Sequence, residues 1–220
     1  INKLKTELKE IQKQRNIQNS NRINAYRISL VGYTHAGKSS LMKKLTDSDV
    51  FIEDKLFATL DTTTRTMDIK LGIPVLLSDT VGFIKNLPHN LIASFRSTLG
   101  EIKDVNLLLK IFDSSSSNLH IHIDTVNEVL NNLDVFNKPS ITIFNKIDSI
   151  PDISQLNGLK KRHDDAIFIS ALNNIGIDII NNQIKKTIKS NFIRETFNIP
   201  YKNSKIIDLI YKSTHVIKKK

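Results

Sequence analysis

Short apolar runs alternate with longer segments whose apolar residues recur every three or four positions from residue 26 onward. The short runs predict strands, and the longer segments predict amphipathic helices. The predicted strands cover residues 27–31, 66–71, 75–78, 107–112, 139–144 and 167–169. The predicted helices cover residues 38–45, 91–103, 119–133 and 177–188. This alternation favours an α/β fold with a mainly parallel, six-stranded sheet and helices on both of its faces.

Both ends of the chain carry helical patterns outside this alternation. Apolar residues recur at helical spacing at Ile1, Leu4, Leu8 and Ile11. A second, short amphipathic helix is predicted at residues 206–210. We therefore divide the chain into a linker helix at 1–24, a central domain at 25–194 and the start of a C-terminal domain at 195–220. Because the chain opens on isoleucine inside a helical pattern, we expect a fragment of a longer natural protein whose N-terminal part is missing.

The composition narrows the class of protein. The 220 residues are 40% hydrophobic, which is enough for the core of one α/β domain. There is no cysteine, so a disulfide framework and cysteine-ligated zinc are excluded. No apolar run approaches the roughly 18 residues that a membrane-spanning helix needs, and no signal-peptide pattern opens the chain. We expect a monomeric, cytoplasmic protein.

The net charge of +10 is concentrated in the two flanks. Residues 1–27 hold seven Lys and Arg against two Glu, and residues 200–220 hold six Lys against one Asp. The central residues 28–199 hold 19 basic and 19 acidic side chains. Basic flanks attract phosphate backbones through counterion release, so RNA is the favoured partner. The alternative is a solvated charged helix and a frayed lysine tail.

The segment after the first predicted strand has the spacing G-x-x-x-x-G-K-[ST] of a phosphate-binding loop (P-loop). Its residues, with the next position, are Gly32, Tyr33, Thr34, His35, Ala36, Gly37, Lys38, Ser39 and Ser40. Between an apolar strand and a helix, such a loop surrounds phosphates with backbone N–H groups. We expect Lys38 to bridge the β- and γ-phosphates of a nucleoside triphosphate and the Ser39 hydroxyl to coordinate Mg²⁺.

A second segment, Asp79-Thr80-Val81-Gly82, follows the strand predicted at residues 75–78. Asp79 is the expected Walker-B-type carboxylate, holding Mg²⁺ through a water. The Gly82 N–H is expected to donate to the γ-phosphate, which would make the following loop sensitive to triphosphate against diphosphate. By itself Asp-x-x-Gly is typical of an ordinary turn, but its place after an apolar strand favours the nucleotide site.

Two further segments predict the base. The first is Asn145, Lys146, Ile147 and Asp148, and the second is Ser170, Ala171 and Leu172. A buried Asp148 carboxylate can accept hydrogen bonds from N1–H and the 2-amino group of guanine, whereas adenine would leave it unpaired, at a cost of about 1–3 kcal/mol. We expect Asn145 to brace neighbouring loops and reach N7, the Lys146 stem to cover one face of the base, and the Ala171 N–H to meet O6. These segments predict a site for GTP and GDP.

Longer runs around these motifs resemble the HflX family of GTPases. They are Val31-Gly32-Tyr33-Thr34, Leu56-Phe57-Ala58-Thr59-Leu60-Asp61, and Leu77-Ser78-Asp79-Thr80-Val81-Gly82-Phe83-Ile84 with Leu87-Pro88-His89. The resemblance covers nearly the whole chain, including the helix before the P-loop and Ile199-Pro200-Tyr201. It implies GTP hydrolysis with Mg²⁺, binding to the large ribosomal subunit and its RNA, and splitting or rescue of stalled ribosomes.

The resemblance also implies roles for single residues. The family's switch I threonine maps onto Thr59, which becomes the expected second protein ligand of Mg²⁺, although Thr62, Thr63 or Thr64 could serve instead. With Lys38 and Gly82, Thr59 completes the expected catalytic set. Its neighbours Phe57, Ala58, Leu60 and Asp61 are expected to line the nucleotide.

Two positions depart from common GTPase patterns. Phe83 stands where many GTPases have the glutamine that orients the attacking water, so slow intrinsic hydrolysis is expected unless this ring is only a core residue. His35 stands where the family usually has asparagine, which helps bind potassium in related GTPases. Because imidazole is a poor potassium ligand, we expect His35 to contribute only its backbone to the phosphate cradle.

Two classes of function fit these observations. The first is an enzyme whose hydrolysis of GTP to GDP and phosphate times its release from the ribosome. The second is a nucleotide-controlled docking or ribosome-assembly module with incidental turnover. An ATP-driven RNA remodeller is disfavoured, because no motif in the 220 residues predicts an adenine site.

Overall fold

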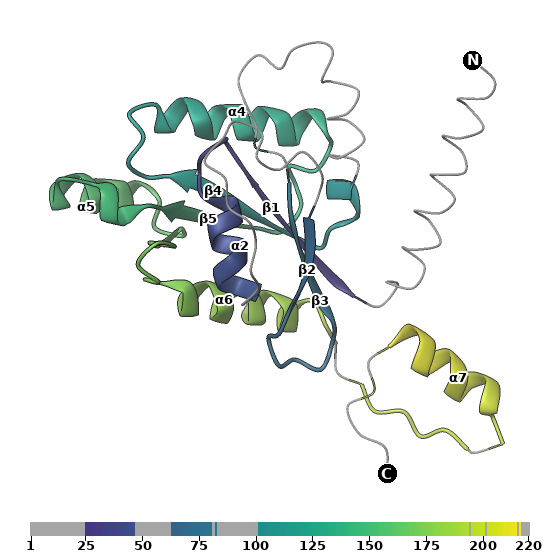
Figure 1. Ribbon diagram of the computed structural model, residues 1–220. Coiled ribbons are helices and arrows are strands. Elements are labelled where there is room, and N and C mark those ends of the chain that lie inside the picture. The colour runs from purple at the N-terminus through teal and green to yellow at the C-terminus, as the bar shows by residue number, and fades with distance from the viewer. Residues whose placement is uncertain are drawn as a thin grey trace, which may run out of the picture. The chain divides into compact units, whose positions relative to one another are not determined.

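The computed structural model describes residues 25–46, 63–80, 82, 101–193, 195–200, 202–214 and 216 (Figure 1). The helix predicted at the N-terminus and residues 91–100 of the helix predicted at 91–103 lie outside these ranges. Contacts group the chain into two compact units. One unit comprises residues 26–71 and 75–194 and contains the sheet, and the other comprises residues 1–25, 72–74 and 195–220.

The described residues form a six-stranded sheet, as predicted. Its strands are β1 (Tyr26–Gly32), β2 (Thr63–Met67), β3 (Val75–Asp79), β4 (Leu107–Asp113), β5 (Ser140–Asn145) and β6 (Ile167–Phe168). Their order is β2-β3-β1-β4-β5-β6, and every neighbouring pair is parallel except β2 with β3. β1 is buried at six of its seven positions, as expected for a central parallel strand covered on both faces.

The second strand begins three residues earlier than the sequence predicts. Residues 66–71 were the expected strand, but β2 spans Thr63–Met67 and pairs along its whole length with β3. Beyond it, Lys70 and Gly72 adopt positive φ angles of 53° and 74°, which ordinary strand geometry does not allow. The chain therefore turns at the place where the apolar pattern alone suggested that the strand continues.

Helices cover both faces of this sheet. Among the described residues of this unit, the helices are α2 (Lys38–Thr46), α4 (Leu119–Asn132), α5 (Ile153–Arg162) and α6 (Ile177–Ser190). Figure 1 shows α2 and α6 on one side of the sheet and α4 on the opposite side. Leu159 of α5 belongs to the same buried cluster as Val126 and Leu130 of α4, so α5 lies on the α4 side. The fold predicted from the sequence is confirmed in these features.

The α5 helix was missed in the sequence. Residues 101–103, the described end of the helix predicted at 91–103, belong only to a 3₁₀ turn (η2, Glu101–Asp104). α5 buries a single side chain, Leu159, so its apolar stripe is too thin to stand out. The residues that mark both ends of α5 are nevertheless recognisable in the sequence. Asp152 accepts a hydrogen bond from the Ser154 N–H at 2.8 Å, and three basic residues occupy the last turn.

The described part of the second unit includes the helix α7 (Ser204–Ser213), which is longer at both ends than the helix predicted at 206–210. Its apolar residues Ile206, Leu209 and Tyr211 are exposed. Across the ranges that the structure describes, none of the helices combines the length and the apolar character needed to cross a bilayer.

The order of the strands defines where a ligand fits. The chain leaves β1 toward β3 on one side and later returns as β4 on the other side. In open α/β sheets, ligands bind beyond the carboxyl ends of the strands where the order reverses in this way. The P-loop follows β1, so it lies at that point.

Candidate functional site

Two glycines allow the P-loop to follow β1 closely. A Cβ on Gly32 would lie 2.2 Å from the carbonyl oxygen of Ile111 on β4, so any larger residue would separate these strands. Gly37 has φ +89°, and its Cβ would lie 2.3 Å from Nδ2 of Asn145. His35 also has a positive φ, of 60°, and its side chain is exposed. These positions shape a tight loop whose last residue leads directly into α2.

The Lys38 side chain is buried inside this loop. Its ammonium group donates to the carbonyl oxygens of Gly32 at 3.4 Å and Tyr33 at 3.2 Å. Burial lowers its pKa from 10.5 to about 8, and the nearby Asp79 carboxylate partly opposes that shift. A desolvated cation is thus held at the first turn of α2, where the helix N-terminus also favours anions.

Ser39 and Asp79 form the pair expected for a magnesium ion. The Ser39 hydroxyl donates to Oδ2 of Asp79 at 2.6 Å, and Asp79, at the end of β3, is buried. Next to it, the Thr80 hydroxyl donates to the carbonyl of Leu30 at 2.7 Å, which ties the start of the following loop to β1. A hydroxyl beside a carboxylate is a set of hard oxygen donors, the kind that Mg²⁺ prefers, so the residues fit this ion.

Gly82 lies against the P-loop. A Cβ at this position would be 2.8 Å from Cγ2 of Thr34 and 2.9 Å from Nζ of Lys38. The backbone of Gly82 therefore passes within reach of the only buried ammonium group among the described residues. The two segments that the sequence assigns to the triphosphate are adjacent in space.

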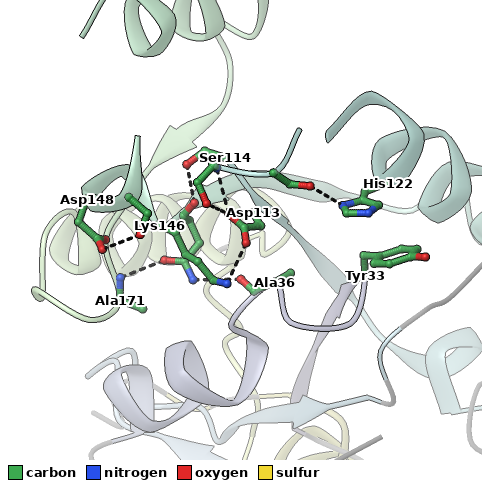
Figure 2. Close-up of polar contacts among 12 residues, drawn as sticks. Tyr33, Ala36, Asp113, Ser114, His122, Lys146, Asp148 and Ala171 are labelled. Carbon is green, nitrogen blue, oxygen red and sulfur yellow. Dashed lines mark hydrogen bonds and ion pairs between the residues drawn. The ribbon is translucent and has the colours of Figure 1, made fainter. Parts of the chain in front are cut away.

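Asn145 joins three segments of the site (Figure 2). Its Nδ2 donates to the carbonyl of Ala36 in the P-loop at 3.0 Å. Its Oδ1 accepts from the N–H of Ala171 at 3.0 Å. The expected bracing role is confirmed by these contacts. The Ala171 N–H, for which the sequence predicts a contact with guanine O6, donates here to the Asn145 side chain, and the contact with O6 stays a prediction.

Asp148 is exposed, whereas the sequence argument took it as buried. Asp148 lies in the 3₁₀ turn η3 (Ile147–Ser149). A carboxylate that binds a base arriving from solvent has to be accessible to solvent before the base binds. Hydrogen bonding from the Ser170 side chain is the main cause that lowers the pKa of Asp148, and Ser149 and Lys146 also contribute. The carboxylate is therefore ionised, and acts only as an acceptor, at neutral pH.

The loop after β6 carries the last predicted segment. Ser170 is fully buried and pairs with Ile175 through two backbone hydrogen bonds of 3.1 and 3.0 Å. Ala171 is buried and Leu172 is 80% exposed, so only the first two residues face the interior.

Sequence reasoning missed three contacts made by residues at the end of β4 and beyond it. Asp113 pairs with Lys146 at 2.8 Å, and Ser114 hydrogen-bonds the Asn145 carbonyl. The His122 ring of α4 stacks on Tyr33 of the P-loop (Figure 2). The ring centroids are 3.9 Å apart, and the angle between the ring planes is 13°. The position of Asp113 at the carboxyl end of a predicted strand was the available signal. Nothing in the sequence indicated the stacking.

Several predicted site residues lie outside the described ranges. They are Phe57, Ala58, Thr59, Leu60, Asp61 and Val81, together with Thr62 and Phe83. Thr63 and Thr64, which the sequence also allows as ligands of Mg²⁺, belong to β2. Thr64 shares a hydrogen bond of 2.9 Å with Ser78 of β3.

Comparison with known proteins agrees with this geometry. Residues 27–146 match the family described as 50S ribosome-binding GTPase. A protein named GTPase HflX from Gluconacetobacter diazotrophicus is 40% identical over 214 residues, 97% of this chain and 47% of its own length. A second GTPase HflX, from Flavobacterium psychrophilum, is 51% identical over 146 residues, 66% of this chain and 35% of its own.

A solved structure extends the comparison to the fold. The crystal structure of a GTP-binding protein from Sulfolobus solfataricus in complex with GDP aligns with a TM-score of 0.60 and 26% identity, covering 86% of this chain and 59% of that one. The present chain spans about half the length of the first relative above, or less for the second. The chain therefore belongs to the 50S ribosome-binding GTPase family and, within it, to the HflX-type GTPases.

Proposed function

We propose that this chain binds GTP with Mg²⁺ and hydrolyses it to GDP and phosphate. One observation carries the proposal: Asn145, three residues before the ionised Asp148, ties the P-loop at Ala36 to the loop at Ala171. The N-K-x-D segment and the P-loop are thus joined directly by hydrogen bonds. The GDP complex of the archaeal neighbour supports the same ligand class.

The base is selected by hydrogen-bond polarity. The Asp148 carboxylate accepts from N1–H and the 2-amino group of guanine, and adenine offers no donor at those atoms. The Lys146 stem covers one face of the ring. These roles follow from the position of both residues immediately after β5, beside the braced Asn145.

The phosphates are held by the P-loop and its lysine. Backbone N–H groups of the loop surround the β-phosphate, and Lys38 neutralises charge on the β- and γ-oxygens. Ser39 and Asp79 would hold Mg²⁺, which supplies charge neutralisation on those same oxygens. The Gly82 N–H donates to the γ-phosphate, so the position of the loop that follows Gly82 depends on whether GTP or GDP is bound. Hydrolysis by the isolated chain is slow, because the phenyl ring of Phe83, the residue after Gly82, cannot orient the attacking water.

For the cellular role, we propose binding to the large ribosomal subunit and GTP-dependent splitting or rescue of stalled ribosomes in the cytoplasm. The family description, 50S ribosome-binding GTPase, and the basic flanks support this assignment. The competing role is a docking or assembly module in which turnover is incidental. The two differ in whether the ribosome accelerates hydrolysis.

Measuring phosphate release with and without ribosomes distinguishes the splitting or rescue role from the docking or assembly role. We expect 50S subunits to accelerate GTP turnover by the chain at least tenfold, because a partner must order the site around the attacking water. Sedimentation with 50S subunits should also be stronger with a non-hydrolysable GTP analogue than with GDP. Binding without acceleration would favour the docking module.

Replacement of Gly82 by alanine separates triphosphate from diphosphate binding. The added methyl group would lie 2.8 Å from Cγ2 of Thr34, so the loop has to move away and the γ-phosphate contact is lost. We expect about a tenfold loss of affinity for a non-hydrolysable GTP analogue, the effect of one charge-assisted hydrogen bond, with GDP affinity unchanged within about threefold. Fluorescent-nucleotide titration measures both.

Gly158→Ala is the matched control, since a Cβ there meets only Arg162 Nη2, at 3.9 Å. Equal losses for both nucleotides in Gly82→Ala would contradict the assigned role.

The pKa of Lys38 predicts proton uptake on binding. With a pKa of about 8, the Lys38 amine is mostly neutral at pH 8.5 and mostly charged at pH 7. Phosphate oxygens favour the charged form, so binding raises the pKa and takes up a proton chiefly at the higher pH. Calorimetry of GDP in buffers of different ionisation enthalpy should give about two-thirds of a proton more at pH 8.5 than at pH 7. Lys38→Arg, charged at both values, should not show this increase.

A further inference from the structure

The loop that follows β4 is built against the guanine motif. Asp113 is the last residue of β4 and stands opposite Asn145, the last residue of β5, in the parallel register. Both the backbone N–H and the hydroxyl of Ser114 donate to the Asn145 carbonyl, at 2.9 and 2.6 Å. The end of β5 is thereby fixed from its neighbouring strand, one residue before Lys146.

The Asp113 carboxylate is itself held in one orientation. Its Oδ1 accepts from the N–H of Ser115 at 3.0 Å and from the Ser115 hydroxyl at 2.6 Å. Its Oδ2 remains directed at Lys146 and lies 2.8 Å from Nζ. The Asp113 side chain is 19% exposed and that of Lys146 36%, so water screens the pair only in part. Figure 2 shows the side chains of Asp113 and Lys146 close to each other.

Lys146 lies where the chain leaves β5, and its backbone conformation is unusual. It has φ 64° and ψ 38°, a left-handed conformation that is uncommon for a residue with a long side chain. This conformation ends β5 and starts the turn that carries Asp148. Without the ion pair to Asp113, the Lys146 side chain would sample many rotamers, and ordering it when a nucleotide binds would reduce the affinity for that nucleotide.

We propose that Asp113 is a positioning residue of the guanine subsite: through its ion pair it holds the Lys146 stem in the plane where that stem covers the base. Asp113 touches no part of the nucleotide and acts only through Lys146. The inference rests on the proposed binding of guanine nucleotides. It adds to the N-K-x-D motif a fourth group, from a different strand, that prepares the site before the ligand arrives.

A double-mutant cycle tests the proposal on the full chain, with GDP as the probe. Asp113→Ala and Lys146→Ala are each expected to lower GDP affinity about tenfold, the effect of losing one ordered contact. If Asp113 acts through Lys146, then Asp113→Ala has no further effect in the Lys146→Ala background. Binding of inorganic pyrophosphate, which reaches only the P-loop, should not change in any of these variants.

Two further variants separate positioning from folding. Asp113→Asn keeps an oxygen acceptor for Ser115 but loses the negative charge, so it is expected to reproduce the loss of GDP affinity with an unchanged melting temperature. Asp124→Ala removes an exposed carboxylate of α4 and should bind GDP as the unmodified chain does.

Three results would overturn the positioning role. The first is a GDP affinity of Asp113→Ala within twofold of the unmodified chain, and the second is an equal loss in both Lys146 backgrounds. The third is a parallel loss of pyrophosphate binding, which would indicate a general structural defect. Failure of the proposed function is distinguishable from these, because the unmodified chain would then bind pyrophosphate but no guanine nucleotide.

Discussion

Lys38→Ala is expected to abolish binding of GTP and GDP at micromolar nucleotide concentrations. The ammonium group is buried within the P-loop and donates to two of its carbonyl oxygens, at 3.4 and 3.2 Å, beside the path of Gly82. Its removal takes away about two charge-assisted hydrogen bonds to phosphate, each of about 1.5–3 kcal/mol. Affinity should therefore fall by roughly a hundredfold or more. Isothermal calorimetry with GDP and a GTP analogue measures the loss.

Two control variants are needed to interpret the result for Lys38→Ala. Lys38→Met keeps an apolar stem of similar length, so it distinguishes loss of charge from a cavity at the start of α2. Lys44→Ala removes an exposed ammonium group from the same helix and should bind nucleotide normally. Retained affinity in Lys38→Met would mean that the lysine charge does not serve the phosphates.

Asp148→Asn is expected to change which base is preferred. The amide can turn an N–H₂ donor toward the base where the carboxylate only accepts, so guanine loses a complementary partner and xanthine, with a carbonyl at C2, gains one. We expect GTP affinity to fall about tenfold to a hundredfold, as one or two charge-assisted hydrogen bonds are lost. Affinity for xanthosine triphosphate should rise.

Competition of purine nucleotides against a fluorescent analogue measures this change. Asp152→Asn is a suitable control, since Asp152 is an exposed carboxylate that caps α5 through Ser154. Undiminished preference for GTP in Asp148→Asn would contradict the account of base selection, while the phosphate site could still stand.

The parts of the fold that were predicted well are those with strong local patterns. β4 and β5 are short apolar runs buried among helices, and α6 repeats Ile177, Ile180, Ile184 and Ile188 along one buried face. α5 and the exact span of β2 were missed, because a thin apolar stripe and a turn with positive φ leave weak periodic signals.

Local chemistry alone was enough to identify the segments of the candidate site and the ligand class they indicate. A P-loop, a strand-ending aspartate and an N-K-x-D run are recognisable because their spacing is set by neighbours along the chain. The sequence did not predict the surroundings of these segments. It did not predict that Asp148 is exposed, that the Ala171 N–H donates to Asn145, or that Asp113 pairs with Lys146.

Those surroundings depend on contacts between residues that are distant in sequence. Asn145 and Ala36 are separated by 109 positions, and they meet only because β4 places β5 near β1 in the sheet. The order of strands arises from packing of the whole domain, which no local pattern encodes. The sequence therefore identifies which chemical groups form the candidate site. The assembled sheet decides which partners these groups contact, how they are oriented and how far solvent reaches them.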